Sequence, residues 1–80
     1  MDIHYSKQAK KYLEKIPPSH RALIKNAIHK IPEGHIEPLR GYKQSLKLRV
    51  NSYRVIFQYN GDIINIEMIL SRGDVYKSGY

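Results

Sequence analysis

Basic and apolar side chains alternate along residues 46–57, and this alternation places cations on one side of a predicted β-hairpin. With residues 51 and 52 as a two-residue turn, Arg49 lies directly opposite Arg54, and Lys47 lies on the same face. Like charges that face each other across strands are mildly destabilising unless an anion or solvent lies between them. This face is therefore either a site for phosphate or an ordinary surface of solvated cations.

Two more side chains follow the last predicted strand and can reach the same face. Arg72 lies just beyond the strand, and Tyr76 comes four residues later. A tyrosine among cations can take part in proton transfer. It can also stack on an unpaired base, as in the recognition of single-stranded RNA, or simply pack against the sheet edge. The spacing leaves these three roles for Tyr76 open.

Helical periodicity precedes the hairpin. Apolar residues recur at helical spacing within residues 7–16 and again within residues 19–31. Ser6 is a candidate N-cap for the first helix. The two prolines at positions 17 and 18 separate the helices, so we expect an antiparallel helical hairpin. Residues 2–5 are compatible with a short strand, and residues 32–44 are expected to be irregular.

Three strands are predicted in the second half, over residues 45–50, 53–59 and 62–70. Asn60-Gly61 is the strongest hairpin signal in the chain and pairs Tyr59 with Asp62. Counting out from this turn gives the pairs Phe57–Ile64, Val55–Ile66, Tyr53–Met68 and, on the other face, Arg54–Glu67. The order β-α-α-β-β-β predicts one α+β domain over residues 1–80, with the helical hairpin packed on one face of a small twisted antiparallel sheet.

The composition narrows the classes of partner. The chain has 80 residues, a net charge of +7 and no cysteine. Its basic residues are spread along both halves, so the fold itself must display the charge to nucleic acid, an acidic protein or an anionic surface, or simply to solvent. No apolar run is long enough for a membrane span, and the four histidines lack metal-ligand spacing. We expect a cytoplasmic protein with no metal or other cofactor.

Four sequence segments together resemble the corresponding segments of the RelE/ParE superfamily of toxin–antitoxin toxins. They are Leu39-Arg40-Gly41, Leu46-Lys47-Leu48-Arg49-Val50, Ser52-Tyr53-Arg54-Val55-Ile56-Phe57 and Arg72-Gly73-Asp74-Val75-Tyr76-Lys77. The two predicted helices and the first short strand also fit that fold, so the resemblance covers essentially the whole chain. Ser45 stands where RelE-type proteins often carry a lysine.

The resemblance implies an activity. RelE-type toxins are metal-independent endoribonucleases that cut messenger RNA in the ribosomal A site through attack of the ribose 2′-OH on the adjacent phosphate. Carried onto this chain, the catalytic residues would be Lys47, Arg54, Arg72 and Tyr76. Lys43, Arg49 and Lys77 would bind RNA. Preorganised cations that stabilise the developing negative charge are the physical rationale for such a site.

The resemblance also implies partners and alternatives. The expected partners are a cognate antitoxin, the ribosome and messenger RNA, with no membrane partner and with DNA contacted only through the antitoxin. ParE-type toxins, which inhibit DNA gyrase, share much of the same pattern, so a gyrase inhibitor is the first alternative. A degenerate, non-toxic member of the family that only binds its antitoxin is the second.

Overall fold

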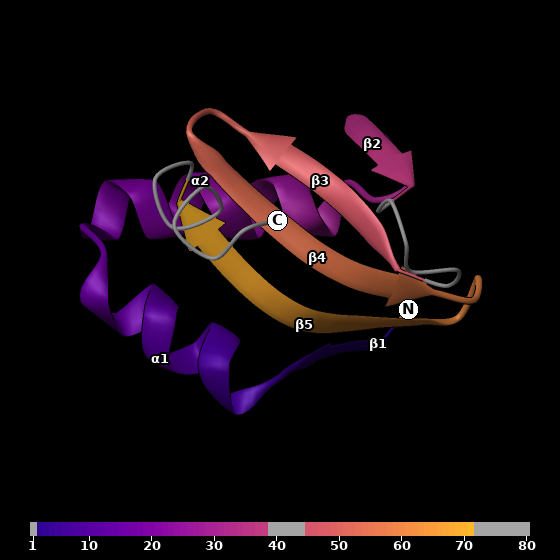
Figure 1. Ribbon diagram of the computed structural model, residues 1–80, viewed down its shortest axis with the longest axis horizontal. Coiled ribbons are helices and arrows are strands. Elements are labelled where there is room, and N and C mark those ends of the chain that lie inside the picture. The colour runs from indigo at the N-terminus through magenta and orange to yellow at the C-terminus, as the bar shows by residue number, and fades with distance from the viewer. Residues whose placement is uncertain (1, 39–44, 72–80) are drawn as a thin grey trace.

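The structure is a computed structural model that describes residues 2–38 and 45–71. Its elements are β1 (Asp2–Tyr5), α1 (Lys7–Lys15), α2 (Pro18–His29), β2 (His35–Pro38), β3 (Leu46–Val50), β4 (Tyr53–Tyr59) and β5 (Ile63–Ser71). The strands form a five-stranded sheet in the order β1-β5-β4-β3-β2; in the view of Figure 1, α2 lies behind the sheet and α1 lies beside β5. Neighbouring strands are antiparallel except β1 and β5, which run parallel. The predicted α+β fold is confirmed, with one strand more than expected and with a mixed sheet rather than the expected antiparallel one.

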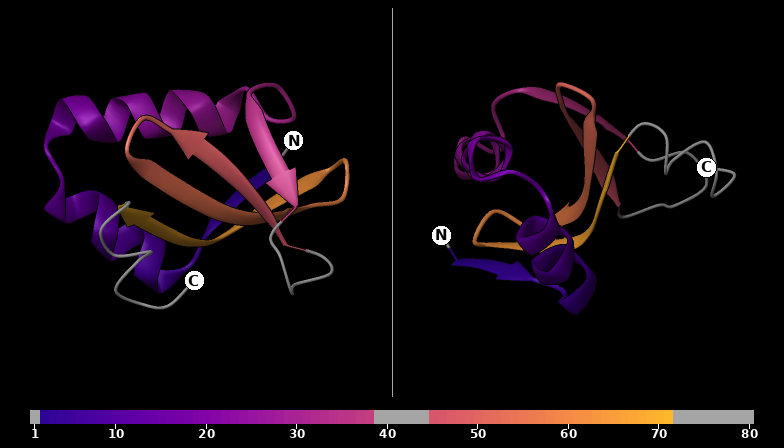
Figure 2. Two further views of the ribbon diagram at one scale, coloured as in Figure 1. Left: turned by 45° about the horizontal axis from the view of Figure 1, so that its top comes forward. Right: turned by 90° about the vertical axis from the view of Figure 1, so that its left-hand side faces the viewer.

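Both helices cover the same face of the sheet (Figure 2). The first helix ends at Lys15, one residue before the predicted end, and Ser6 caps its start by accepting a hydrogen bond from the Ala9 N–H at 3.1 Å. The second helix runs from Pro18 to His29 rather than from 19 to 31. A proline is well suited to a first helical position because its missing N–H has no partner there in any case.

Hydrogen bonds connect the start of α1 to β5. The Ser6 hydroxyl donates to the Glu67 carbonyl at 2.6 Å, and the Ser6 N–H donates to the Ile66 carbonyl at 2.9 Å. Two residues later, the Gln8 side-chain amide both donates to the Ile69 carbonyl and accepts from the Ile69 N–H, each at 3.0 Å. These contacts satisfy backbone groups of β5 at Ile66, the last residue that pairs with β1, and just beyond it.

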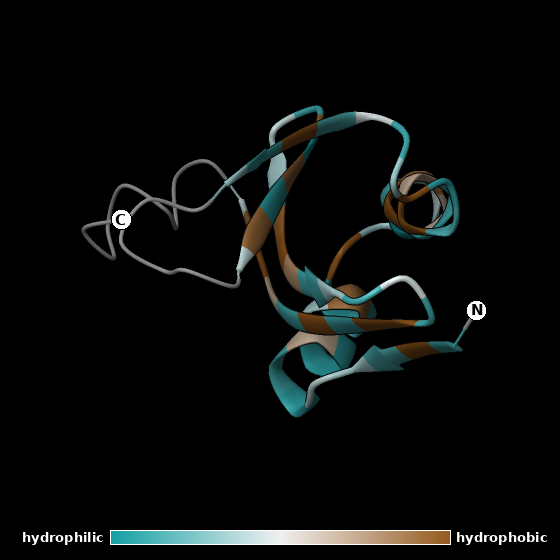
Figure 3. Cartoon of the chain, turned by 90° about the vertical axis from the view of Figure 1, so that its right-hand side faces the viewer, coloured by the Kyte–Doolittle hydropathy of each residue, from teal (hydrophilic) through white to brown (hydrophobic). Residues whose placement is uncertain are grey.

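Apolar residues from both layers meet between the helices and the sheet. The helices contribute Ala9, Leu13, Ile24 and Ile28, and the strands contribute Leu48, Val50, Val55, Phe57, Ile64, Ile66 and Ile69. Figure 3 shows the corresponding hydrophobic segments along the central strands. Phe57 is the largest fully buried side chain. The Arg21 guanidinium of α2 connects the two helices, since it donates a hydrogen bond to the Leu13 carbonyl near the end of α1.

The first predicted hairpin is confirmed. Val50 pairs with Tyr53, Leu48 with Val55 and Leu46 with Phe57, so residues 51 and 52 are the turn. Asn51 has a φ of 53°, a conformation that asparagine tolerates better than most residues. The other side of this hairpin therefore carries the alternating cations, as the sequence predicts.

The expectation of an irregular segment over residues 32–44 is wrong in part. Residues His35–Pro38 form β2, which pairs antiparallel with β3 and places Glu37 opposite Lys47. The strand is short and contains a proline, which weakens its sequence signal. It lies at the sheet edge, where proline is tolerated because one side of the strand needs no ladder hydrogen bond.

The predicted register between β4 and β5 is wrong. Tyr59 pairs with Ile64 rather than Asp62, because the Asn60 side chain accepts hydrogen bonds from the N–H groups of Asp62 and Ile63, which makes a wider turn than two residues. Phe57 pairs with Ile66 rather than with the expected Ile64, and a second irregularity follows because Ile56 pairs with Met68. Glu67 is thus the extra residue of a β-bulge.

The bulge shifts every later pair. Val55 lies opposite Ile69, Tyr53 opposite Ser71 and Arg54 opposite Leu70. The expected pairs of Val55 with Ile66, of Tyr53 with Met68 and of Arg54 with Glu67 are therefore corrected. Met68 lies opposite Ile56, so the register puts it on the face that points away from the helices.

Candidate functional site

The face of the sheet that points away from the helices is called the open face here. On β2 to β5, its residues follow from strand pairing: His35, Glu37, Lys47, Arg49, Arg54, Ile56, Gln58, Asn65, Met68 and Leu70. This set joins cations, a carboxylate and amides from four strands. Four strands of a hydrogen-bonded sheet hold such side chains at fixed spacing, which is what a binding surface requires.

Two arginines lie together at one end of the open face. Arg49 and Arg54 are direct cross-strand partners, and Arg49 is exposed whereas Arg54 is half-buried. The Arg54 Nη1 donates to the backbone carbonyls of Tyr53 at 3.0 Å and Asn51 at 3.4 Å. These bonds hold the guanidinium beside the turn. Within residues 2–38 and 45–71, neither arginine forms an ion pair with a carboxylate, so their positive charge is available to an anion.

Lys47 lies in the next row of the open face and has an acidic neighbour. Its Nζ is 3.6 Å from the Glu37 carboxylate on β2. Their side chains are 29% and 50% exposed, and an ion pair that solvent reaches so readily contributes at most about 1 kcal/mol. A phosphate can therefore compete for the ammonium. The sequence analysis missed Glu37 because it placed no strand there, although the alternation of His35, Ile36 and Glu37 is a weak strand signal.

Two buried apolar side chains lie among the charged side chains of the open face. Ile56 and Leu70 are each 7% exposed but lie outside the core between the helices and the sheet. Ile56 pairs with Lys47 on one side and Met68 on the other, and Leu70 pairs with Arg54. The aliphatic stems of lysine and arginine cover neighbouring apolar surface while their charged ends remain in solvent.

A carboxylate lies near the middle of the open face. The Ser45 hydroxyl, on a residue that is 8% exposed, donates to Glu67 Oε1 at 2.7 Å. Ser45 precedes β3 and Glu67 lies in the bulge of β5, so this hydrogen bond spans β4. The bulge, which the sequence pattern does not reveal, thus moves Glu67 away from Arg54 and toward Ser45.

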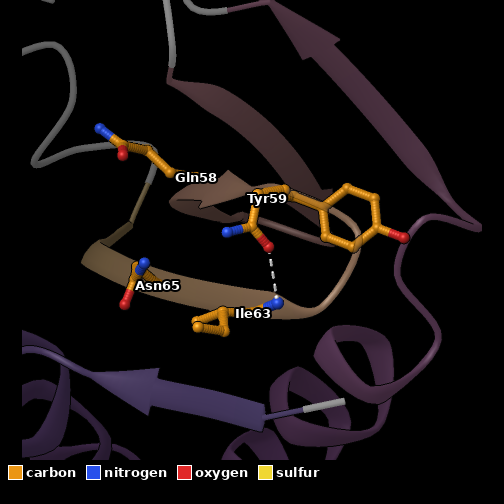
Figure 4. Close-up of a pocket in the computed structure, with 5 residues that line it drawn as sticks. Gln58, Tyr59, Ile63 and Asn65 are labelled. Carbon is orange, nitrogen blue, oxygen red and sulfur yellow. Dashed lines mark hydrogen bonds between the residues drawn. The ribbon is translucent and has the colours of Figure 1, made fainter.

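A shallow hollow of about 390 Å³ lies at the end of the open face that carries the amide side chains of Gln58 and Asn65. Gln58, Tyr59, Asn60, Ile63 and Asn65 line it, and Figure 4 shows them around the β4–β5 turn. Gln58 and Asn65 are cross-strand partners, and side-chain amides both donate and accept hydrogen bonds. This hollow can therefore bind a polar group without a charge preference.

The structure brings together the predicted site residues that it describes. Lys47, Arg49 and Arg54 share the open face, and Ser45 and Glu67 lie beside them. The predictions for Lys43, Arg72, Tyr76 and Lys77 fall outside the described residues. Over the described ranges, no three potential metal ligands from His, Cys, Asp and Glu gather in one place. No helix there is long and apolar enough to cross a bilayer.

Comparisons with known proteins identify the family. Residues 3–76 match the family model described as the ParE toxin of the type II toxin–antitoxin system parDE. No curated protein matches the sequence. The RelB–RelE antitoxin–toxin complex from Methanococcus jannaschii is similar in structure, with 25% identity, a TM-score of 0.79, and coverage of 96% of this chain and 99% of that chain.

Two further solved structures share the fold at lower identity. The intact E. coli RelBE toxin–antitoxin complex has a TM-score of 0.68 and 18% identity, with coverage of 88% of this chain and 94% of that chain. YafQ from E. coli strain BL21(DE3) has a TM-score of 0.67 and 18% identity, with coverage of 94% and 97%. The family model covers nearly the whole chain, and the chain belongs to the RelE/ParE family of type II toxin–antitoxin toxins.

Proposed function

We propose that this protein is a ribosome-dependent endoribonuclease that cleaves messenger RNA and is neutralised by a cognate antitoxin. The observation that carries the proposal is the pair Arg49 and Arg54, which face each other on the open face with no carboxylate partner among the described residues. Lys47 adds a third cation one row away. Facing cations of this kind are stabilised when an anion lies between them, and a polynucleotide supplies phosphates at regular spacing.

The proposed reaction is an internal transesterification. The 2′-oxygen of the ribose attacks the adjacent phosphorus, the bond from phosphorus to the 5′-oxygen breaks, and a 2′,3′-cyclic phosphate and a 5′-hydroxyl remain. Negative charge builds on the phosphoryl oxygens in the transition state. Arg54 and Lys47 are proposed to stabilise that charge, because preorganised cations need no reorganisation at the moment of reaction. Arg72 and Tyr76 are proposed to complete the site, and Lys43, Arg49 and Lys77 to bind RNA.

The proposed antitoxin is an acidic protein. The chain carries a net charge of +7, and complementary charge both steers association and selects partners. Solved relatives of this fold include toxin–antitoxin complexes from Methanococcus jannaschii and E. coli. An acidic extended or helical segment that wraps around the sheet and helices would cover the cations and so prevent RNA from binding.

The test is to map cuts in translated messages by primer extension after expression of the wild type and of three variants. Arg54→Ala is expected to lower cleavage about 100-fold or more, in the range found when one transition-state donor is removed. Lys47→Ala is expected to lower cleavage less. Lys25→Ala, an exposed lysine of α2 on the helical side, is the matched control and should cleave like the wild type.

A gyrase inhibitor is the second candidate, and the description of the matching family model as a ParE toxin favours it. Assays of DNA supercoiling on the same purified proteins separate the two functions. Inhibited supercoiling with intact messages would replace the ribonuclease proposal by this one. Harmless expression of folded protein that still binds its antitoxin would instead indicate a non-toxic member of the family.

A further inference from the structure

A β-bulge presents one carboxylate to the open face. Glu67 is the extra residue between the pairs Phe57–Ile66 and Ile56–Met68. A bulge interrupts the alternation of a strand and redirects a side chain, and bulges are frequent beside active sites. The backbone on both sides of this bulge is held by α1, through the bonds from Ser6 to Ile66 and Glu67 and from Gln8 to Ile69. The position of the Glu67 backbone is therefore fixed.

The Glu67 carboxylate is directed over the open face. Its Oε1 accepts a hydrogen bond from the Ser45 hydroxyl at 2.7 Å. Ser45 and Lys47 are two residues apart on one extended segment, so their side chains point to the same face. Two strand spacings, about 9.5 Å, separate the backbones of β3 and β5. The Glu67 side chain must therefore cross above β4, next to Ile56 and Gln58.

Glu37 of β2 and Glu67 of β5 have different surroundings. Glu37 forms an ion pair with Lys47, whereas Glu67 forms none with any lysine or arginine of the described ranges. Its Oε2 accepts no hydrogen bond from the part of the chain that the structure describes, and the residue is exposed. Ser45 thus orients the carboxylate without neutralising it. An oriented carboxylate with one open oxygen is suited to accept a proton.

We infer that Glu67 is the general base of the proposed RNA cleavage and that Ser45 positions it. Glu67 Oε2 takes the proton of the 2′-hydroxyl as the 2′-oxygen forms its bond to phosphorus. The electron pair of the breaking bond leaves with the 5′-oxygen, which takes a proton from water. Glu67 then returns its proton to solvent, so no other reactant is consumed. This inference rests on the proposed ribonuclease function.

The experiment measures single-turnover cleavage on messenger-programmed ribosomes at saturating toxin, together with the affinity for those ribosomes. Glu67→Gln keeps the oxygen that accepts from Ser45 and removes only the ability to take a proton. We expect its cleavage rate to fall about 100-fold or more, as for the loss of a general base, with unchanged affinity. Ser45→Ala should give a smaller loss of rate. Glu14→Gln, which removes the same charge from an exposed position of α1, is the matched control and should cleave at the wild-type rate.

Each other outcome overturns the inference in a distinguishable way. Wild-type cleavage by Glu67→Gln would show that another group takes the proton, and the ribonuclease proposal would stand. An equal loss in Glu14→Gln would indicate a general effect of the net charge of the protein rather than a base at Glu67. A loss of ribosome affinity or of thermal stability in Glu67→Gln, in proportion to the loss of rate, would assign Glu67 a structural role. If the wild type does not cleave messages at all, both the proposed function and the inference are wrong.

Discussion

The two sides of β4 are built from adjacent residues but are held in place by different forces. On the helical side, Val55 and Phe57 are fully buried among apolar side chains. On the open side, Arg54 and Gln58 are only half-buried, and hydrogen bonds to backbone carbonyls hold Arg54 in place. Burial of apolar area stabilises the fold, whereas half-exposed polar groups contribute little to it and remain available to partners.

This difference shows how a small domain separates the side that stabilises the fold from the side proposed to bind RNA. One strand serves both, because its side chains alternate between the two faces. The separation is incomplete at the β5 bulge, where Ser6 and Gln8 of the helical layer bind the backbone that carries Glu67. Substitutions on either face therefore test whether the two roles are independent.

The largest expected effect is on the helical side. Phe57→Ala should lower the free energy of unfolding by about 3–5 kcal/mol, because it removes buried surface and leaves a cavity. Urea denaturation measures this loss, and Phe57→Leu gives a smaller one if the alanine variant does not fold. Gln58→Ala, the next residue on the opposite face, should change stability by less than about 0.5 kcal/mol. Equal losses at the two positions would contradict the division of β4 into a stabilising side and a side that contributes little to stability.

A smaller effect is expected where the two layers join. Ser6→Ala removes both the N-cap of α1 and the hydrogen bond to the Glu67 carbonyl. Loss of an N-cap lowers stability by about 1–2 kcal/mol, so we expect a change of that size in thermal or urea unfolding. Ser19→Ala is the matched control, since Ser19 is exposed in the first turn of α2 and makes no capping hydrogen bond. If the two alanine variants are equally stable, the junction contributes nothing to the fold.

The sequence predicts the helical side better than the open side. The first hairpin could be predicted in register because its apolar residues alternate strictly and its turn has two residues. The N-cap at Ser6 could be predicted because a serine precedes the first periodic apolar residue. In both cases a local pattern and the packed core require the same arrangement.

The open side depends on contacts that local patterns do not encode. Residues 68, 69 and 70 are all apolar, so alternation cannot decide which of them faces the helices, and the bulge at Glu67 goes undetected. The Asn60 side chain widens the second turn by bonding to two backbone N–H groups, which a two-residue turn rule does not anticipate. The ion pair of Glu37 with Lys47 needs β2, a short strand whose pairing is long-range. Three predicted cations nevertheless lie on one face, because the first hairpin alone positions them.

A still smaller effect is expected for the ion pair on the open face. Glu37→Gln should change the free energy of unfolding by no more than about 1 kcal/mol, because both partners are partly exposed. Salt screens charges over about 10 Å at 0.1 M and about 3 Å at 1 M. The difference between the wild type and the variant should therefore shrink when urea denaturation is repeated at 1 M NaCl. A difference that does not depend on salt would indicate that packing, not charge, holds β2 to β3.

The smallest effect is expected at high pH, on the helical side. Burial raises the pKa of Tyr5 above its ordinary value of 10.0. The unfolded chain therefore loses this proton at a pH where the folded protein still holds it, and stability falls as pH rises from about 10 through the folded pKa. Tyr5→Phe removes this titration. The free energy of unfolding should thus fall more steeply for the wild type than for Tyr5→Phe between about pH 9 and pH 11. Parallel curves would mean that the Tyr5 phenol remains hydrated, and that the helical side is less completely closed to water at β1 than at β4.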